Sequence, residues 1–124
     1  MSKKKVLIVD DQEMIRKLVK MTLSSGEFEV HEAKEGTEAL MIAQKIRPDV
    51  IILDVMMPGE FNGIEVCKRL RTVSMTSESI ILMLSAKTQE IDKEEGMAAG
   101  ATDYLVKPFS PQYLVQVMNS YLDA

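Results

Sequence analysis

The sequence contains little of what builds cross-links, metal clusters or nucleotide sites. Among its 124 residues there is one cysteine, Cys67, one histidine and no tryptophan. A single cysteine excludes an intrachain disulfide framework and a cysteine-based zinc site, and it suits a reducing compartment. The sequence has no glycine-rich phosphate-binding loop, which argues against a bound nucleotide. It also has no apolar run that approaches the length of a membrane span.

An excess of basic residues is absent as well. The chain carries 15 Lys and Arg against 19 Asp and Glu, a formal net charge of −4, whereas a general nucleic-acid binder needs a basic face. The apolar stretch after the N-terminal lysines is too short for a signal peptide and ends in acids. With 46% hydrophobic residues, 124 residues suffice for one domain with a real core. We expect a cytoplasmic domain that binds neither nucleic acid directly nor a membrane.

Short apolar runs predict five strands. Val6–Val9, Val50–Leu53 and Ile80–Leu84 are rich in Val, Ile and Leu without polar alternation, as expected of strands that are covered on both faces. Phe28–Ala33 alternates apolar and polar residues and predicts a more exposed edge strand. Tyr104–Val106 is a short fifth candidate.

Helical periodicity fills the segments between these runs. The first predicted helix carries Met14, Leu18 and Met21 on one face and stops at Gly26. The others are expected at Ala39–Ile46, Ile64–Leu70, Ile91–Ala99 and Ser110–Asp123, the last with Ser110 as its N-cap.

Five strands that alternate with five helices predict an α/β fold, a doubly wound (βα)5 parallel sheet with helices on both faces. In such sheets ligands bind outside the carboxyl ends of the strands. The residues that directly follow each strand are therefore the candidates for a site.

Polar residues stand at four of these strand ends. They are Asp10 and Asp11, Asp54, Ser85 and Lys107. Taken singly, Asp11 or Ser85 can cap a helix, and Lys107 can be a surface lysine. Asp54 is harder to explain in this way, because apolar residues precede and follow it and a buried acid is costly unless it is paired or ligated. Together the five predict a site at one end of the sheet.

The charges of this set indicate its chemistry. Two carboxylates about 4 Å apart repel by roughly 4 kcal/mol at an effective dielectric near 20, so a counter-charge is needed. Lys107 can neutralise one carboxylate, and an oxygen-only site for the rest favours Mg²⁺ over zinc, with room left for a phosphate. Asp54, on the middle strand, can accept a phosphoryl group as an aspartyl-phosphate, with Ser85 donating a hydrogen bond to it.

At this point the chain resembles a response-regulator receiver domain of two-component signalling, in the CheY-like superfamily. The resemblance rests on the ordered segments "VLIVDDQ", "DVIILDVMMPG", "ILMLSA" and "GATDYLVKPF" and extends over essentially the whole chain. It implies a strand order of 2-1-3-4-5. We expect a single receiver domain over residues 1–124, with no output domain in this chain.

The resemblance implies a role for each matched residue of the metal site. Asp54 would be the phosphoacceptor. Asp11 and Asp54 would ligate Mg²⁺, which Mn²⁺ could replace, and the main-chain carbonyl of Met56 would complete the protein ligands. Asp10 would support the metal through water or orient the site.

The resemblance also implies a switch. Lys107 would pair with Asp54 and then with the phosphoryl group, and a cis peptide bond would join it to Pro108. Ser85 would be the switch hydroxyl, drawn toward the phosphoryl group, and Tyr104 the switch aromatic; Tyr104 is alternatively an ordinary half-buried strand tyrosine.

Partners follow from the same resemblance. A sensor histidine kinase or a histidine phosphotransfer protein would supply the phosphoryl group, and a downstream protein would read the surface of the fourth helix, fifth strand and fifth helix. The fifth helix contains no Lys or Arg, which disfavours the symmetric dimer of one DNA-binding subfamily. We expect a monomer or a weak, phosphorylation-dependent dimer.

The sequence departs from the family pattern after Gly59. Glu60-Phe61-Asn62-Gly63 is one residue longer than usual, and Phe61 is a partner contact, a lid or a buried anchor. Met56 and Lys87 occupy positions that tune hydrolysis in the family, and neither suits the positioning of water, which predicts slow self-dephosphorylation.

Two other classes of protein remain as alternatives. A small phosphatase of the haloacid dehalogenase type would need an acid two residues after its nucleophile, where Met56 follows Asp54. An interaction module without phosphorylation would not need the complete set of acids, hydroxyl and lysine. We therefore expect no enzyme beyond self-phosphorylation from phosphodonors and slow self-dephosphorylation. Cys67 and most of the ten methionines are predicted to fill the core.

Overall fold

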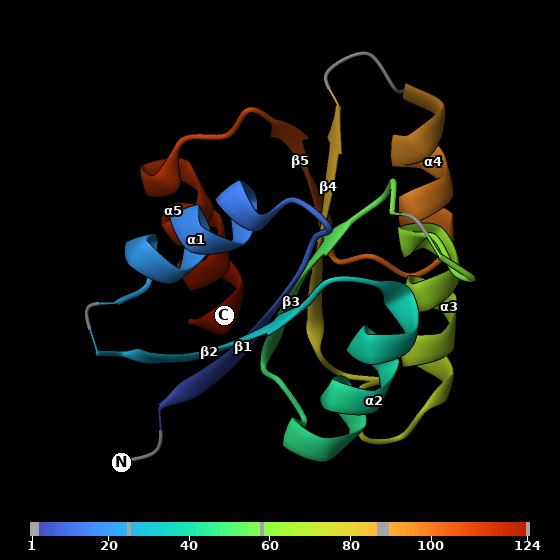
Figure 1. Ribbon diagram of the computed structural model, residues 1–124, viewed down its shortest axis with the longest axis horizontal. Helices are drawn as coiled ribbons and strands as arrows, with labels where there is room; N and C mark the ends of the chain where they lie inside the picture. Colours follow the sequence, from blue (N-terminus) through green and yellow to red (C-terminus); the bar gives the residue numbers. More distant parts are fainter. Residues whose placement is uncertain (1–2, 25, 58, 87–89, 124) are drawn as a thin grey trace.

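The computed structural model describes residues 3–24, 26–57, 59–86 and 90–123. Within these ranges strands and helices alternate along the chain (Figure 1). The strands are β1 (Lys4–Val9), β2 (Phe28–Ala33), β3 (Val50–Asp54), β4 (Ile80–Ala86) and β5 (Asp103–Lys107). The helices are α1 (Glu13–Thr22), α2 (Gly36–Ile46), α3 (Gly63–Thr72), α4 (Glu90–Ala98) and α5 (Pro111–Leu122).

The five strands form one parallel sheet in the order β2-β1-β3-β4-β5. This confirms the predicted doubly wound (βα)5 fold and its strand order. Because all strands run in the same direction, their carboxyl ends share one edge of the sheet. In register, Val9 lies beside Leu53 and Asp54 lies beside Leu84, so the residues at the carboxyl ends of β1, β3 and β4 are brought together at that edge.

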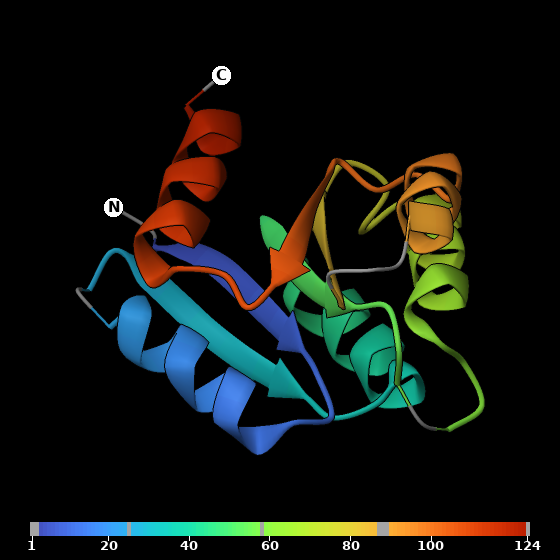
Figure 2. The ribbon, with the colours of Figure 1, turned by 90° about the horizontal axis from the view of Figure 1, so that it is seen from above.

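Each face of the sheet has its own apolar core. Helices α1 and α5 cover one face, and α2, α3 and α4 cover the other (Figures 1 and 2). In β1, Val6 and Ile8 pack on the α1/α5 side, while Leu7 and Val9 pack on the opposite side. Burial on both faces explains why the central strands are continuous apolar runs.

Side chains cap two of the helices. Ser110 accepts a hydrogen bond from the main-chain N–H of Tyr113 at 3.0 Å, as predicted, and Pro111 begins α5. Asn62 accepts one from the N–H of Glu65 at 2.9 Å and starts α3. Such caps satisfy N–H groups that have no partner inside the helix.

The prediction that most of the ten methionines fill the core is wrong, because at least five of them are exposed. Five have exposed side chains, at 44–77% of their full exposure: Met14, Met21, Met41, Met56 and Met97. In α1 the residues that face the sheet are Arg16 and Val19. The stripe of Met14 and Met21 therefore lies on the solvent side, because the helix carries apolar residues on two faces and tertiary packing selects only one.

Arg71 joins the end of α3 to the segments before β4 and β5. Its Nε donates to the carbonyl of Gly100 at 2.7 Å, its Nη1 to the carbonyls of Ser77 and Ser79 at 3.1 and 2.6 Å, and its Nη2 to Thr102 at 3.1 Å. Gly100 has φ +110°, and a Cβ there would lie 2.7 Å from Cγ of Arg71. Only glycine fits this close approach.

None of the helices in the described part of the chain combines the length and apolar composition required to cross a bilayer.

Candidate functional site

Three carboxylates meet at the carboxyl edge of the sheet. Asp10 follows β1, Asp11 comes next, and Asp54 is the last residue of β3. One oxygen from each of these side chains lies within 4.8 Å of the others. Asp10 is fully buried and Asp54 is 5% exposed, whereas Asp11 is exposed. The structure thus brings together the three acids that the sequence placed at strand ends.

Lys107, the last residue of β5, brings the positive charge. Its Nζ lies 2.9 Å from Oδ2 of Asp10 and 3.4 Å from Oδ1 of Asp54, and it donates to Oε1 of Gln12 at 3.3 Å. The ammonium is therefore closer to Asp10 than to the predicted partner Asp54. The peptide bond between Lys107 and Pro108 is cis, as predicted.

Asp10 is held by its surroundings, but one of its oxygens is not satisfied. Oδ1 accepts the main-chain N–H of Gln12 at 2.9 Å. Oδ2 is buried and, although the Lys107 ammonium is near, it accepts no well-directed hydrogen bond from the described residues. Such a group is costly unless a further donor or a cation reaches it.

The alternative role of Asp11 as a helix cap is wrong. The N-cap residue of α1 is Gln12, and no side chain caps it. Asp10, one residue earlier, makes the local contact to the Gln12 N–H. Asp11 is therefore left exposed beside the two buried acids, with its carboxylate free of any capping role.

Burial and charge both act on the buried groups. Burial, and then the charge of Asp10, raises the pKa of Asp54 from 3.8 to about 7, against the opposing effect of Lys107. Burial would lower the pKa of Lys107, but its contacts with Asp10 and Asp54 prevail and raise it. Without a cation, Lys107 therefore stays protonated, and Asp54 loses its proton only at a higher pH than an ordinary aspartate does.

The predicted switch residues lie on β4 and β5, the two strands that follow β3 in the sheet order. Ser85 follows Leu84, the register neighbour of Asp54, and is 1% exposed. Tyr104 is half-buried, lies beside Met83 in register and packs against the core on the α2/α3/α4 side. The Met56 side chain is 62% exposed, so only its main chain is suited to the predicted role. Lys87 lies outside the described residues.

The loop with the extra residue is anchored beside Asp54. Phe61 is half-buried against the core, and its ring lies 4.0 Å below the guanidinium of Arg69. A Cβ on Gly36 would lie 2.9 Å from the carbonyl oxygen of Phe61, and one on Gly63 would lie 2.1 Å from that of Asp54. Of the three roles left open for Phe61, the structure supports the buried anchor.

Sequence reasoning missed two residues at this edge, Gln12 and Arg16. The Nη1 of Arg16 donates to the main-chain carbonyl of Asp10 at 2.8 Å, and the residue is only 7% exposed. A signal was present, because Arg16 stands three residues before Val19 and seven before Leu23, on the stripe that faces the sheet. Gln12 offered no comparable pattern.

The arrangement fits a hard divalent cation. Its donors are all carboxylate oxygens, one of them is buried without a hydrogen bond, and three acids face one ammonium. Oxygen donors with an excess of negative charge are typical of Mg²⁺ or Mn²⁺ sites.

Comparison with known proteins gives concordant results. The family model described as the response regulator receiver domain matches residues 6–119. The chain is 48% identical over 109 residues to the alkaline phosphatase synthesis transcriptional regulatory protein PhoP of Bacillus subtilis, a match that covers 88% of this chain and 44% of PhoP. The chain thus spans less than half the length of this curated relative.

Solved structures of the same fold cover nearly all of the chain. Chemotaxis protein CheY4 of Vibrio cholerae has a TM-score of 0.89 and 45% identity, covering 96% of this chain and 98% of that one. A response regulator described as putative from Chloroflexus aurantiacus has a TM-score of 0.92 and 39% identity, with 99% and 100% covered.

Proposed function

Since this chain belongs to the family of response regulator receiver domains, we propose that it is a phosphoacceptor switch of two-component signalling, with Asp54 as the residue that takes the phosphoryl group. The observation that carries the proposal is the cluster of Asp10, Asp11 and Asp54 with the ammonium of Lys107 at the carboxyl edge of the sheet. The match to the family model, over residues 6–119, includes all four of these residues.

Asp11 and Asp54 would hold Mg²⁺, or Mn²⁺ in its place, together with the main-chain carbonyl of Met56. Asp10 would support the metal through water or orient the site. The buried Oδ2 of Asp10 that lacks a hydrogen bond fits a nearby cation. When bound, the ion neutralises negative charge on the phosphoryl oxygens.

Asp54 would act as the nucleophile in its ionised form. A bond forms between one of its carboxylate oxygens and phosphorus, while the bond from phosphorus to the donor breaks and its electron pair leaves with the donor. Lys107, already in contact with Asp54, would then pair with the negatively charged phosphoryl group. Ser85 would donate a hydrogen bond to one phosphoryl oxygen. The half-buried ring of Tyr104 would turn inward as Ser85 moves.

The donor would be a sensor histidine kinase or a histidine phosphotransfer protein, in the cytoplasm. The output surface would consist of α4, β5 and α5, where the apolar side chains of Met97, Val106 and Tyr113 are 44%, 39% and 52% exposed. An added phosphoryl charge would bias this surface between two states and so regulate a protein partner or relay the phosphoryl group.

The same surface gives little support for contacts with nucleic acid or for a strong dimer. α5 carries no basic residue in its last turn, and Asp103 at the start of β5 accepts a hydrogen bond from the Tyr121 hydroxyl of the same chain at 2.6 Å. We propose a monomer or a weak dimer that forms on phosphorylation.

Self-dephosphorylation would be slow. Met56, two residues after Asp54, has an exposed thioether side chain that cannot orient an attacking water. We expect the phosphorylated chain to persist after removal of the donor, as followed by intact-mass measurement over time. Rapid decay in the purified chain without any phosphatase would contradict this expectation.

Incubation with acetyl phosphate and Mg²⁺, followed by mass measurement, tests the proposal. We expect one added phosphoryl group, which is lost in Asp54→Asn and retained in Asp49→Asn, a control at the residue directly before β3, away from the site. Repeated release of phosphate would instead indicate a phosphatase, and no reaction would indicate an interaction module. Either outcome would overturn the proposal.

A further inference from the structure

Arg16 is a buried charge that the phosphoacceptor chemistry does not use. It lies on α1 at 7% exposure. Its guanidinium donates a hydrogen bond to the main-chain carbonyl of Asp10, the first acid of the site. We propose that Arg16 is a positioning residue for the metal site: it fixes the peptide that joins Asp10 to Asp11, so that both carboxylates face the same cation. This inference rests on the proposed function.

The argument begins with the planarity of the peptide bond. The carbonyl of Asp10 and the N–H of Asp11 belong to one rigid plane. The Nη1 of Arg16 donates to that carbonyl oxygen at 2.8 Å. A hydrogen bond from a charged donor is short and strong, so it sets the direction of this plane. The plane in turn sets where the Cα of Asp11, and hence its side chain, begins.

The contact of Arg16 complements the other constraints on Asp10. The N–H of Asp10 donates to the carbonyl of Ala33 at 3.1 Å, and its Oδ1 accepts from Gln12 at 2.9 Å. These bonds fix the backbone before Asp10 and the side chain itself. Arg16 supplies a restraint on the peptide that leads to Asp11, and Asp11 is exposed with no core packing to orient it.

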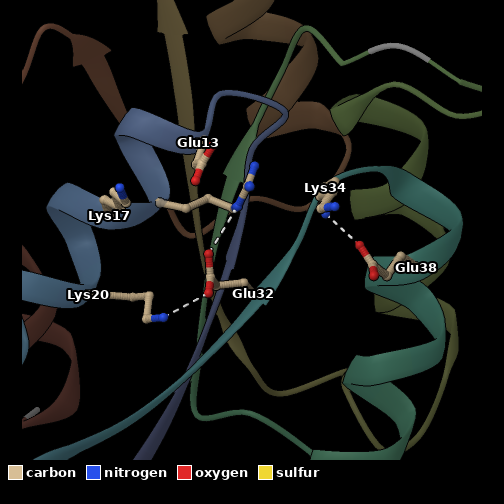
Figure 3. Close-up of a pocket in the computed structure, with 7 residues that line it drawn as sticks. Glu13, Lys17, Lys20, Glu32, Lys34 and Glu38 are labelled. Carbon is tan, nitrogen blue, oxygen red and sulfur yellow. Dashed lines mark hydrogen bonds and ion pairs between the residues drawn. The ribbon is translucent and has the colours of Figure 1, made fainter.

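Arg16 is itself held from the opposite side. Its Nε donates to Oε1 of Glu32 on β2 at 3.0 Å, and Lys20 contacts the other oxygen of Glu32 at 2.9 Å. Figure 3 shows Lys20 and Glu32 facing each other across the space between α1 and β2. The hydrogen bond from Lys20, followed by the one from Arg16, overcomes burial and lowers the pKa of Glu32, so the anchor is a carboxylate at neutral pH.

The same glutamate provides a matched control. Arg16 and Lys20 both carry a positive charge, both pair with Glu32 and both line a cavity of about 380 Å³. Only Arg16 touches Asp10. Arg16→Met and Lys20→Met therefore remove the same charge from the same pair of elements, but only the first releases the Asp10 carbonyl.

The direction of the effect separates positioning from general electrostatics. Loss of a positive charge near a cation site should by Coulomb's law strengthen cation binding. Loss of a positioning contact should weaken cation binding. Residues that hydrogen-bond to metal ligands typically contribute about 10- to 100-fold to metal affinity. Weaker binding in Arg16→Met is thus opposite in sign to the purely electrostatic expectation.

The experiment measures Mn²⁺ binding by electron paramagnetic resonance of the free ion, without any phosphodonor, with Mg²⁺ added as competitor. We expect the Mn²⁺ dissociation constant to rise about tenfold in Arg16→Met and to stay within about twofold of wild type, or fall, in Lys20→Met. The rate of phosphorylation from acetyl phosphate in Arg16→Met should return to the wild-type value at saturating Mg²⁺, because the chemistry at Asp54 is intact.

The outcomes are distinguishable. An unchanged dissociation constant in folded Arg16→Met, or an equal loss of affinity in Lys20→Met, overturns the role of Arg16. If Arg16→Met does not fold, the same criterion applies to Arg16→Lys, which keeps the positive charge but lacks the second nitrogen that joins Glu32 to the Asp10 carbonyl. A wild-type chain that binds no Mn²⁺ overturns the proposed function and this inference with it.

Discussion

Neutralising Asp54, the proposed phosphoacceptor, should stabilise the fold at alkaline pH. The pKa of Asp54 is raised in the folded chain from 3.8 to about 7 by burial and by Asp10. The folded chain therefore keeps a proton that the unfolded chain has already released between these pH values. The free energy of unfolding therefore falls as the pH rises through this window, and the loss is complete above about pH 7. Asp54→Asn carries no such penalty.

The size of the effect follows from the shift. An increase from 3.8 to about 7 corresponds to about 4 kcal/mol at 1.36 kcal/mol per pKa unit. Local relaxation and water penetration reduce this figure, so we expect Asp54→Asn to be about 2–4 kcal/mol more stable than wild type at pH 8 in EDTA. The difference should shrink as the pH is lowered and nearly vanish below pH 4.

Urea unfolding monitored by circular dichroism at pH 4, 6 and 8 provides the test. Asp123→Asn, an exposed acid after α5, is the control and should leave stability unchanged. Addition of Mg²⁺ at pH 8 should narrow the gap, since a bound cation relieves the repulsion in wild type. Equal stability of Asp54→Asn and wild type at pH 8 would refute the electrostatic account of the site.

Four further substitutions, one of them a control for another, test individual contacts. Gly63→Ala would place a Cβ 2.1 Å from the Asp54 carbonyl oxygen, so urea unfolding should show a loss of about 2–3 kcal/mol; Gly26→Ala, with φ +102° but no neighbour within 4 Å, should lose only about 1 kcal/mol. Arg71→Met removes hydrogen bonds to four acceptors and should cost at least about 3 kcal/mol by the same assay; a loss below 1 kcal/mol would contradict the role of this contact. Phe61→Ala should cost about 1–2 kcal/mol without changing the rate of phosphorylation from acetyl phosphate, whereas a changed rate would indicate a lid.

The elements that position the site could be predicted because they depend on short-range patterns. Phe28–Ala33 was predicted with the observed bounds, since the alternation of an edge strand is visible in sequence. The sheet edge followed from the rule that parallel strands share their carboxyl ends. Asp54 was recognisable as unusual because it interrupts an apolar run, and its burial in the structure agrees with that.

The rest depends on contacts between distant segments. Arg16 and Met14 are two residues apart on α1, yet the charged one is buried and the apolar one exposed. Only the positions of Glu32 and of the Asp10 carbonyl, supplied by other elements, make the buried arginine favourable. In the same way, the role of Phe61 depends on the approach of Gly36 from α2, which no local pattern in the loop reveals.

The hydrogen bond from Arg71 to the Gly100 carbonyl restricts how α4 can move. It holds the main chain just after the last turn of this helix, at Gly100, so a rigid movement of α4 must pivot about its C-terminal end. The nine residues of α4 form a lever of about 13 Å at 1.5 Å per residue. A tilt of about 10° would then carry the first turn through about 2 Å and leave the last turn nearly in place. Such a tilt would change the binding of a partner at the start of α4 far more than the binding of a partner at its end.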